Sequence, residues 1–171
     1  MIPIVLVVGA SGAGKTTLVE RLVPALSARG LIVGTVKHAS HGFDADVPGK
    51  DSARHFRAGS AATLLVGPEE QVLFRRARPG RLRDLVDASF VGCDLVIAEG
   101  FSGEPGPKVV VHRRGLPPKD LPPAEKMVLL VTDEPLGYPL EVSSDSLDAI
   151  AEVFVRLIET STHDTPPVSG T

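Results

Sequence analysis

Short apolar runs alternate with amphipathic stretches along most of the chain. Residues 2–8 form a continuous run of mainly β-branched side chains, which is typical of a strand buried on both faces of a parallel sheet. Residues 16–28 then carry leucine and valine at helical spacing, and Gly30 follows as a suitable C-cap. A buried strand that leads directly into an amphipathic helix predicts an α/β fold, with this first strand at the centre of the sheet.

The same alternation continues after the first helix. Further strands are predicted at residues 31–36, 61–66, 71–75, 95–98, 109–111 and 127–131, and further helices at residues 51–58, 82–90 and 144–159. The two strands that flank the Gly67-Pro68 turn are expected to be antiparallel. Together these elements predict a mostly parallel mixed sheet flanked by helices, in three layers. We expect one domain over residues 1–160, and a disordered tail over residues 161–171, which are rich in Ser, Thr and Pro.

A glycine-rich segment joins the first predicted strand to the first predicted helix. Residues 9–16 read GASGAGKT and satisfy the pattern G-x-x-x-x-G-K-[ST] of a P-loop NTPase. Glycines let successive backbone N–H groups converge on phosphate oxygens, and the helix N-terminus adds its positive end. Lys15 is expected to contact the β- and γ-phosphates, and Thr16 to place its hydroxyl on Mg²⁺. The predicted nucleotide-binding residues of this segment are Gly9, Ser11, Gly12, Ala13, Gly14, Lys15, Thr16 and Thr17.

A carboxylate follows the apolar run at residues 95–98. Glu99 occupies the strand-end position at which P-loop proteins more often carry Asp, so it is assigned to the metal site, through a magnesium-bound water, or to the attacking water. The alternative is a solvated residue at the end of a strand. Gly100 directly after it favours close backbone approach and hence the functional interpretation.

Composition excludes several classes of function. The chain is 43% hydrophobic and 23% charged, and no apolar run is long enough to span a membrane, so we expect no membrane partner. The net charge of −3 argues against general binding of nucleic acid. The amino terminus shows no basic leader or cleavage site, which predicts a cytoplasmic protein. Cys93 is the single cysteine, so an internal disulfide is excluded.

A longer signature follows the second predicted strand. Residues 35–52 read TVKHASHGFDADVPGKDS and resemble the stretch T-[IV]-K-H-x-x-H-x-x-D-x-D-x-P-G-K-D-[ST] of the molybdopterin-guanine dinucleotide biosynthesis adapter proteins, the MobB family. Residues 99–101 and 107–113 are similar to the later V-E-G-[FY]-K and P-K-[IV]-x-[VL]-x-R stretches of that family. Ser102 departs from the pattern, because the family often has lysine there. The resemblance covers about residues 2–135.

The resemblance implies a GTP-binding protein with weak GTPase activity. Such a protein would use GTP and Mg²⁺ and would assist the attachment of GMP to molybdopterin. It would be an accessory of the molybdopterin guanylyltransferase rather than the transferase itself, and a homodimer. Molybdopterin is then a further candidate ligand.

Several charged residues are candidates for additional ligand contacts. Lys37 and His38 end the second predicted strand, near the phosphate edge of the sheet, and Lys50, Arg54 and Lys108 could add cationic donors for a phosphate-bearing pterin or a second nucleotide. Each of these residues taken alone is also compatible with a solvated surface charge.

The loop after the second predicted strand contains two aspartates. Asp44 is assigned to Mg²⁺ or to polarising the attacking water, with Asp46 as the other option; both could instead form Asx turns. His38 and His41 could bind a metal ion, which would suit a metallochaperone-type GTPase. A small-molecule P-loop kinase is the other alternative, and it would need a lid with arginines and a base near the acceptor.

The sequence contains no N-K-x-D motif for reading guanine. Asp133, directly after Thr132 at the end of a predicted strand, is the nearest substitute, because its carboxylate could accept hydrogen bonds from guanine N1–H and N2–H. An ordinary turn at the end of a strand is the alternative.

Overall fold

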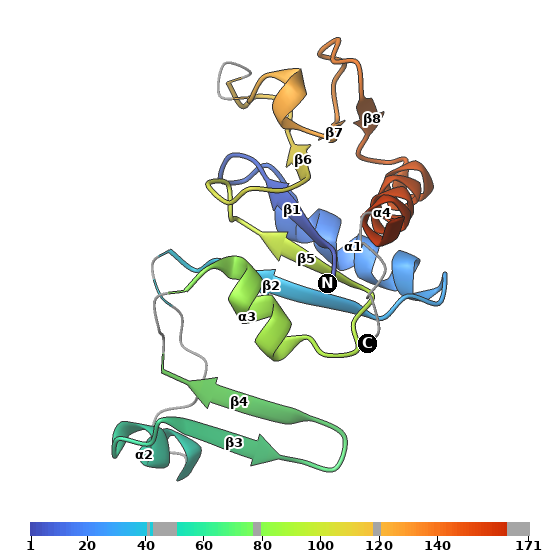
Figure 1. Ribbon diagram of the computed structural model, residues 1–171. Helices are drawn as coiled ribbons and strands as arrows, with labels where there is room; N and C mark the ends of the chain where they lie inside the picture. Colours follow the sequence, from blue (N-terminus) through green and yellow to red (C-terminus); the bar gives the residue numbers. More distant parts are fainter. Residues whose placement is uncertain (41, 43–50, 77–79, 118–120, 164–171) are drawn as a thin grey trace. The chain divides into compact units, whose positions relative to one another are not determined.

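The computed structural model describes residues 1–40, 42, 51–76, 80–117 and 121–163. The chain divides into two compact units (Figure 1). The larger unit consists of Met1–His38 and Leu82–Thr171, and the smaller unit of Ala39–Arg81. In the sequence, the smaller unit lies between β2 (Val33–Lys37) and α3 (Leu82–Ser89) of the larger unit. The single domain expected over residues 1–160 stays a prediction.

The larger unit contains a six-stranded sheet in the order β2-β5-β1-β6-β7-β8, and every neighbouring pair is parallel. The first strand lies between β5 and β6, which confirms its predicted central position. Its strands are β1 (Ile4–Val8), β2 (Val33–Lys37), β5 (Leu95–Glu99), β6 (Lys108–Val111), β7 (Leu129–Thr132) and β8 (Glu141–Ser143).

Helices cover both faces of this sheet, so the predicted three-layer α/β fold is confirmed. Val5 and Val7 of β1 belong to the core under α1 and α4, whereas Leu6 and Val8 belong to the core under α3. Because side chains alternate across a strand, both faces of β1 must be apolar, which explains the continuous apolar run. The helices of this unit are α1 (Lys15–Ser27), α3 (Leu82–Ser89), the short 3₁₀ helix η2 (Ala124–Lys126) and α4 (Leu147–His163).

The smaller unit is an antiparallel hairpin with one helix. Its elements are α2 (Asp51–Arg57), β3 (Ala62–Val66) and β4 (Gln71–Arg75). The predicted antiparallel pairing is confirmed, but the hairpin forms a sheet of its own and the main sheet is not mixed. The ring of Phe56 on α2 lies 6.3 Å from that of Phe74 on β4, and the Arg76 guanidinium lies 4.7 Å above the Phe56 ring.

Two elements near the carboxyl end differ from the prediction. The three-residue strand β8 was missed, because it is too short to produce a recognisable period. Helix α4 begins at Leu147 and continues through His163, so the first three residues of the predicted tail are helical. The remaining tail residues, 164–171, lie outside the described residues. Within the described residues, no helix combines the length and apolar character needed to cross a membrane.

Candidate functional site

The glycine-rich segment lies where β1 ends and α1 begins, as predicted. Gly14 is the N-cap of α1 in the left-handed conformation, with φ of 95°, and no side chain caps the helix there. The first-turn N–H groups of α1 therefore have no capping side chain, and N–H groups at such a helix start can bind an anion. Gly9 has φ of 146°, and a Cβ added to it would lie 2.2 Å from the carbonyl oxygen of Val111 on β6. Only glycine fits at this position.

Lys15 is folded back over the segment. Its Nζ donates hydrogen bonds to the carbonyl oxygens of Gly9, at 3.0 Å, and Ala10, at 2.7 Å. The ammonium group is thereby held at the glycine-rich segment itself, where the lysine of a P-loop contacts phosphate oxygens.

Thr16, Glu99 and Lys37 come together at the carboxyl ends of β2 and β5. Thr16 Oγ1 donates a hydrogen bond of 2.8 Å to Glu99 Oε1. Lys37 Nζ lies 3.0 Å from Thr16 Oγ1 and 3.2 Å from Glu99 Oε1. Parallel pairing explains the meeting, because Lys37 on β2 is in register with Glu99 on β5.

The chemistry of this cluster suits a small, hard cation. A hydroxyl and a carboxylate oxygen are donors that Mg²⁺ accepts, and Mg²⁺ keeps several waters for its remaining positions. Glu99 is 9% exposed, whereas the side chain of Lys37 is 60% exposed. The carboxylate is therefore fixed in the structure, while the lysine can move away from it.

Asp133 lies beside a second hollow next to the glycine-rich segment. This pocket has a volume of about 260 Å³, and Ala13, Gly14, Thr17 and Asp133 all line it. Asp133 Oδ1 accepts a hydrogen bond of 2.6 Å from the backbone N–H of Arg114, so the carboxylate is held in place at the end of β7. The predicted base-reading residue is thus close to the predicted phosphate site.

Four other polar residues line this pocket, and the sequence analysis assigned none of them a binding role. They come from α1, from the end of β6 and from the segment after β8, and are Arg21, His112, Arg113 and Ser144. Arg21 Nη1 donates a hydrogen bond of 2.9 Å to the Ser144 carbonyl oxygen. This bond connects α1 with the segment between β8 and α4. The rule that ligands bind at the carboxyl ends of parallel strands would have indicated His112 and Arg113, which directly follow β6.

His112 is buried, with 4% of its surface exposed. Its Nδ1 lies 3.4 Å from Thr132 Oγ1 and its Nε2 lies 3.2 Å from the carbonyl oxygen of Leu116. These contacts connect the ends of β6 and β7 with the loop that follows β6. His112 is therefore a fixed wall of the pocket.

Other predicted site residues lie elsewhere or are not described. Lys108 is in register with Leu6, two positions before the end of β1, and its Nζ donates to the Glu104 carbonyl oxygen at 2.7 Å. The His38 ring lies 5.2 Å from that of Phe101. Asp44, Lys50, His41 and Asp46 lie outside the described residues. Among the residues that are described, no three His, Cys, Asp or Glu side chains gather as a metal site.

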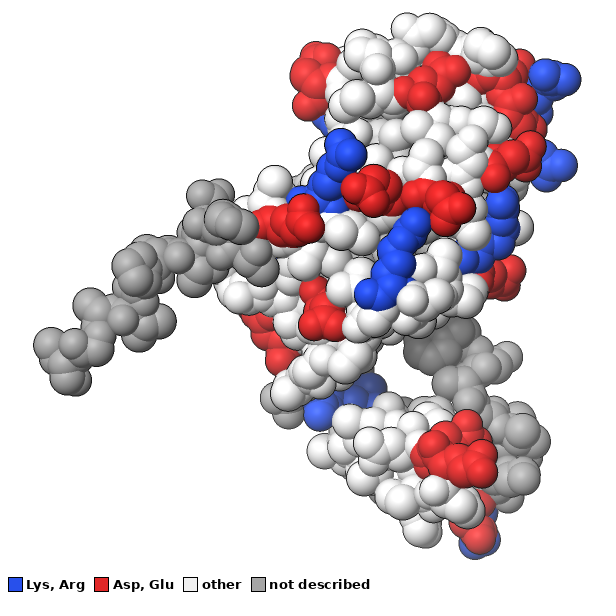
Figure 2. Space-filling model, turned by 90° about the vertical axis from the view of Figure 1, so that its right-hand side faces the viewer, with Lys and Arg blue, Asp and Glu red and all other residues white. Residues whose placement is uncertain are grey.

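The charged surface gives no sign of a single dominant polarity. Figure 2 shows acidic and basic side chains interspersed on one face of the molecule. On α4, Asp148 pairs with Arg29 at 3.1 Å and Glu152 pairs with Arg156 at 3.4 Å. Exposed pairs of this kind contribute little to stability, about 0–1 kcal/mol each.

Comparison with known proteins gives consistent matches. The family model for molybdopterin guanine dinucleotide synthesis protein B, MobB, matches residues 4–133. The molybdopterin-guanine dinucleotide biosynthesis adapter protein of Haemophilus influenzae is 38% identical over 149 residues, covering 86% of this chain and 82% of that protein. The Escherichia coli adapter protein is 36% identical over 168 residues, covering 93% of this chain and 95% of that protein.

Solved structures agree with these sequence matches. A crystal structure of molybdopterin-guanine biosynthesis protein B aligns with a TM-score of 0.70 at 27% identity, covering 91% of this chain and 99% of that one. The crystal structure of Bacillus subtilis MobB aligns with a TM-score of 0.68 at 27% identity, covering 91% and 98%. The likeness therefore includes both compact units of the described chain.

Proposed function

This chain belongs to the MobB family of molybdopterin guanine dinucleotide synthesis proteins, and on that premise we propose that it is a GTP-binding adapter with slow GTPase activity. Its relatives are named as adapter proteins of molybdopterin-guanine dinucleotide biosynthesis, which supports the same pathway role here. The observation that carries the nucleotide proposal is the Thr16–Glu99 contact beside the uncapped start of α1.

Triphosphate binding follows from the glycine-rich segment. The backbone N–H groups of the segment and of the first turn of α1 bind phosphate oxygens, which the helix dipole favours. Lys15 exchanges its two carbonyl contacts for the β- and γ-phosphates. Since those carbonyl contacts are neutral acceptors, an anionic phosphate is the stronger partner for the ammonium group.

The metal proposal rests on Thr16 and Glu99. Bound Mg²⁺ would supply charge neutralisation to the phosphate oxygens. Lys37 neutralises Glu99 when no metal is bound, and its exposed stem lets it turn toward a phosphate oxygen. Asp44, the other residue predicted for the metal, stays a prediction because it lies outside the described residues.

Slow hydrolysis follows from how Glu99 is engaged. Its Oε1 accepts from both Thr16 and Lys37, so this carboxylate serves the metal site and is a poor base for the attacking water. Asp133, the other carboxylate that we place near the glycine-rich segment, accepts from the Arg114 N–H and is assigned to the base rather than to the attacking water. GTP hydrolysis in such a site depends on charge stabilisation alone and is therefore slow. A slow reaction is suited to timing the action of an adapter rather than to metabolic turnover of GTP.

Guanine selectivity is assigned to Asp133. Its carboxylate borders the pocket of about 260 Å³ next to Thr17, where a base attached to a phosphate-bound ribose would lie. The bond from Arg114 N–H holds Oδ1 in a fixed orientation, which prepares the carboxylate to accept from N1–H and N2–H of guanine. Adenine offers no such pair of donors, so GTP is preferred over ATP.

Calorimetric titration of GTP and of ATP, both with Mg²⁺, tests this function. Wild-type protein should bind GTP more tightly than ATP; Lys15→Ala should abolish binding, and Asp133→Asn should reduce the preference for GTP roughly tenfold or more. Arg156→Ala on α4 serves as the control, because its side chain is exposed and its ion pair joins only Glu152. Preferential ATP binding would contradict the guanine assignment and favour a kinase.

We also propose that the protein is a homodimer and contacts the molybdopterin guanylyltransferase. The smaller unit supports self-association, because its hairpin exposes a group of large apolar side chains, with Leu64 54%, Val66 75% and Leu73 49% accessible. Both hairpin strands are edge strands in the described structure. Exposed apolar groups of this kind mark interaction surfaces.

A further inference from the structure

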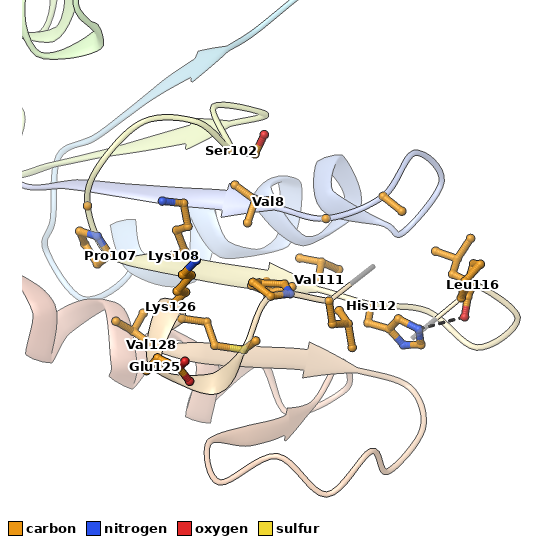
Figure 3. Close-up of a pocket in the computed structure, with 18 residues that line it drawn as sticks. Val8, Ser102, Pro107, Lys108, Val111, His112, Leu116, Glu125, Lys126 and Val128 are labelled. Carbon is orange, nitrogen blue, oxygen red and sulfur yellow. Dashed lines mark hydrogen bonds between the residues drawn. The ribbon is translucent and has the colours of Figure 1, made fainter. Parts of the chain in front are cut away.

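A large cavity lies on the α3-side face of the main sheet. It has a volume of about 780 Å³ and is bounded by β1, β6, the loop between β5 and β6, and the connection from β6 to β7 (Figure 3). Val8, Val110 and Met127 form its floor and belong to the same apolar core as α3. Small-molecule sites typically have volumes of roughly 300–1,000 Å³, so this cavity is large enough for a ligand.

The walls of the cavity are mostly apolar and stiff. Pro107, Pro117 and Pro122 contribute rings with fixed backbone angles, and Leu116 and Leu121 add branched side chains. Flat and aliphatic surfaces of this kind bind the faces of a ring system. The interior therefore suits the apolar or planar body of a ligand.

Positive charge is concentrated at one end of the cavity. Figure 3 shows Lys108 and Lys126 at the end where Pro107 lies, and His112 and Leu116 at the opposite end. Neither lysine forms an ion pair among the described residues, and Lys108 Nζ instead donates to the Glu104 carbonyl oxygen at 2.7 Å. Among the described residues of the lining, Glu125 is the one carboxylate, so two ammonium groups accompany one negative charge there.

The other end of the cavity adjoins the nucleotide site. Gly9 and Ala10 of the glycine-rich segment line the cavity, and His112 lines both this cavity and the pocket that holds Asp133. Lys108 begins β6 and His112 directly follows this strand, four residues later, which corresponds to about 13 Å of extended chain. A ligand of that length would span the cavity from its cationic end to the edge of the nucleotide site.

We propose that this cavity is a second ligand site, for an elongated phosphate monoester with a planar ring body. Its phosphate meets Lys108 and Lys126, and its ring packs between Val8, Val110 and the proline walls. The cavity shares Gly9 and Ala10 with the glycine-rich segment, but its two lysines lie at the opposite end, so both ligands bind at once. A phosphate-bearing pterin belongs to this class of ligand. Only the choice of a pterin rests on the proposed function; the existence of the second site does not.

Fluorescence titration with 1-naphthyl phosphate tests the site, with 1-naphthol and inorganic phosphate as partial probes. Wild-type protein should bind 1-naphthyl phosphate saturably, and more tightly than either partial probe. Lys126→Gln, which changes an exposed side chain, should weaken this binding about tenfold, and Lys108→Gln with Lys126→Gln more strongly. Leu121→Trp, which fills the cavity, should weaken the binding without affecting GTP.

Lys15→Ala separates this inference from the nucleotide proposal. The variant should lose GTP binding and keep wild-type affinity for 1-naphthyl phosphate, and saturating GTP with Mg²⁺ should not displace the probe. Loss of probe binding in Lys15→Ala, or its displacement by GTP, would place the probe on the glycine-rich segment and overturn the second site. Equal affinity for 1-naphthol and 1-naphthyl phosphate would overturn the role of the lysines. If GTP does not bind to the wild-type protein, the nucleotide proposal fails, but saturable binding of 1-naphthyl phosphate would still support the second site.

Discussion

Lys37 occupies a position that a metal ion would otherwise take over. Its ammonium group lies within 3.2 Å of both the Thr16 hydroxyl and the Glu99 carboxylate, the two oxygens proposed for Mg²⁺. A positive side chain at this place keeps the buried carboxylate neutralised before the nucleotide arrives. We therefore expect Lys37 to compete with the proposed Mg²⁺ when no nucleotide is bound.

Substituting Lys37 tests this competition. Lys37→Ala should bind divalent cation up to about fivefold more tightly without nucleotide, because a partly exposed ion pair contributes about 0–1 kcal/mol. Titration with Mn²⁺, followed by electron paramagnetic resonance, measures the affinity. Lys37→Arg keeps the positive charge and should behave as wild type. Weaker Mn²⁺ binding in Lys37→Ala would show that the lysine supports the cation site instead of competing for it.

At the scale of elements, the segment that joins β1 to α1 packs closely against β6, and this packing restricts its first residue to glycine. The Gly9 backbone passes so near to Val111 that no side chain can be accommodated. Several other glycines of the larger unit lie in open space, for example Gly103 in the connection between β5 and β6. The glycines of the segment therefore have two roles here: the proposed access of phosphate at some of them, and close packing against β6 at Gly9.

Gly9→Ala and Gly103→Ala should differ clearly in stability. The added methyl group at Gly9 forces β1 and β6 apart, and overpacking of this kind costs about 1–3 kcal/mol in the free energy of unfolding. Gly103→Ala meets no atom within 4 Å and should change stability by less than about 0.5 kcal/mol. Urea denaturation followed by circular dichroism compares the two variants. Similar stabilities would contradict the packing role of Gly9.

At the scale of the whole molecule, the two units differ in how their apolar residues are used. The larger unit buries its strands between helices, with β5 buried along its entire length. The smaller unit leaves most side chains of its hairpin exposed. A hairpin with so little covered surface is marginally stable alone, which favours an association of chains.

A charge placed on the hairpin tests the proposed homodimer. Leu73→Glu should shift the protein from dimer to monomer, with the dissociation constant raised roughly tenfold or more, because a buried charge is costly in an interface. Light scattering coupled to size-exclusion chromatography measures the mass. Leu85→Glu on α3 is the matched control, since Leu85 is 48% exposed and Leu73 is 49% exposed. A monomeric wild type, or equal effects of both substitutions, would contradict a hairpin interface.

The sequence alone determined the elements whose signal is local. The central strand, the helix after it and the glycine-rich segment between them follow from the apolar period and from the backbone needs of glycine, and the structure confirms them. The position of Glu99 at the end of a buried strand was also predicted, because it directly follows an apolar run. Such features can be predicted from sequence because each depends on neighbours a few residues away in the chain.

Only the tertiary structure decided which distant residues share a site. Lys37 lies beside Thr16 and Glu99 because β2 pairs with β5. Lys108 lies away from the carboxyl end of the sheet because the first residue of β6 is in register with Leu6, in the middle of β1. The tertiary structure also separated the hairpin from the main sheet and formed the cavity beside β6. Strand order, register and the space left between loops arise from contacts between residues far apart in the chain, and no local pattern encodes them.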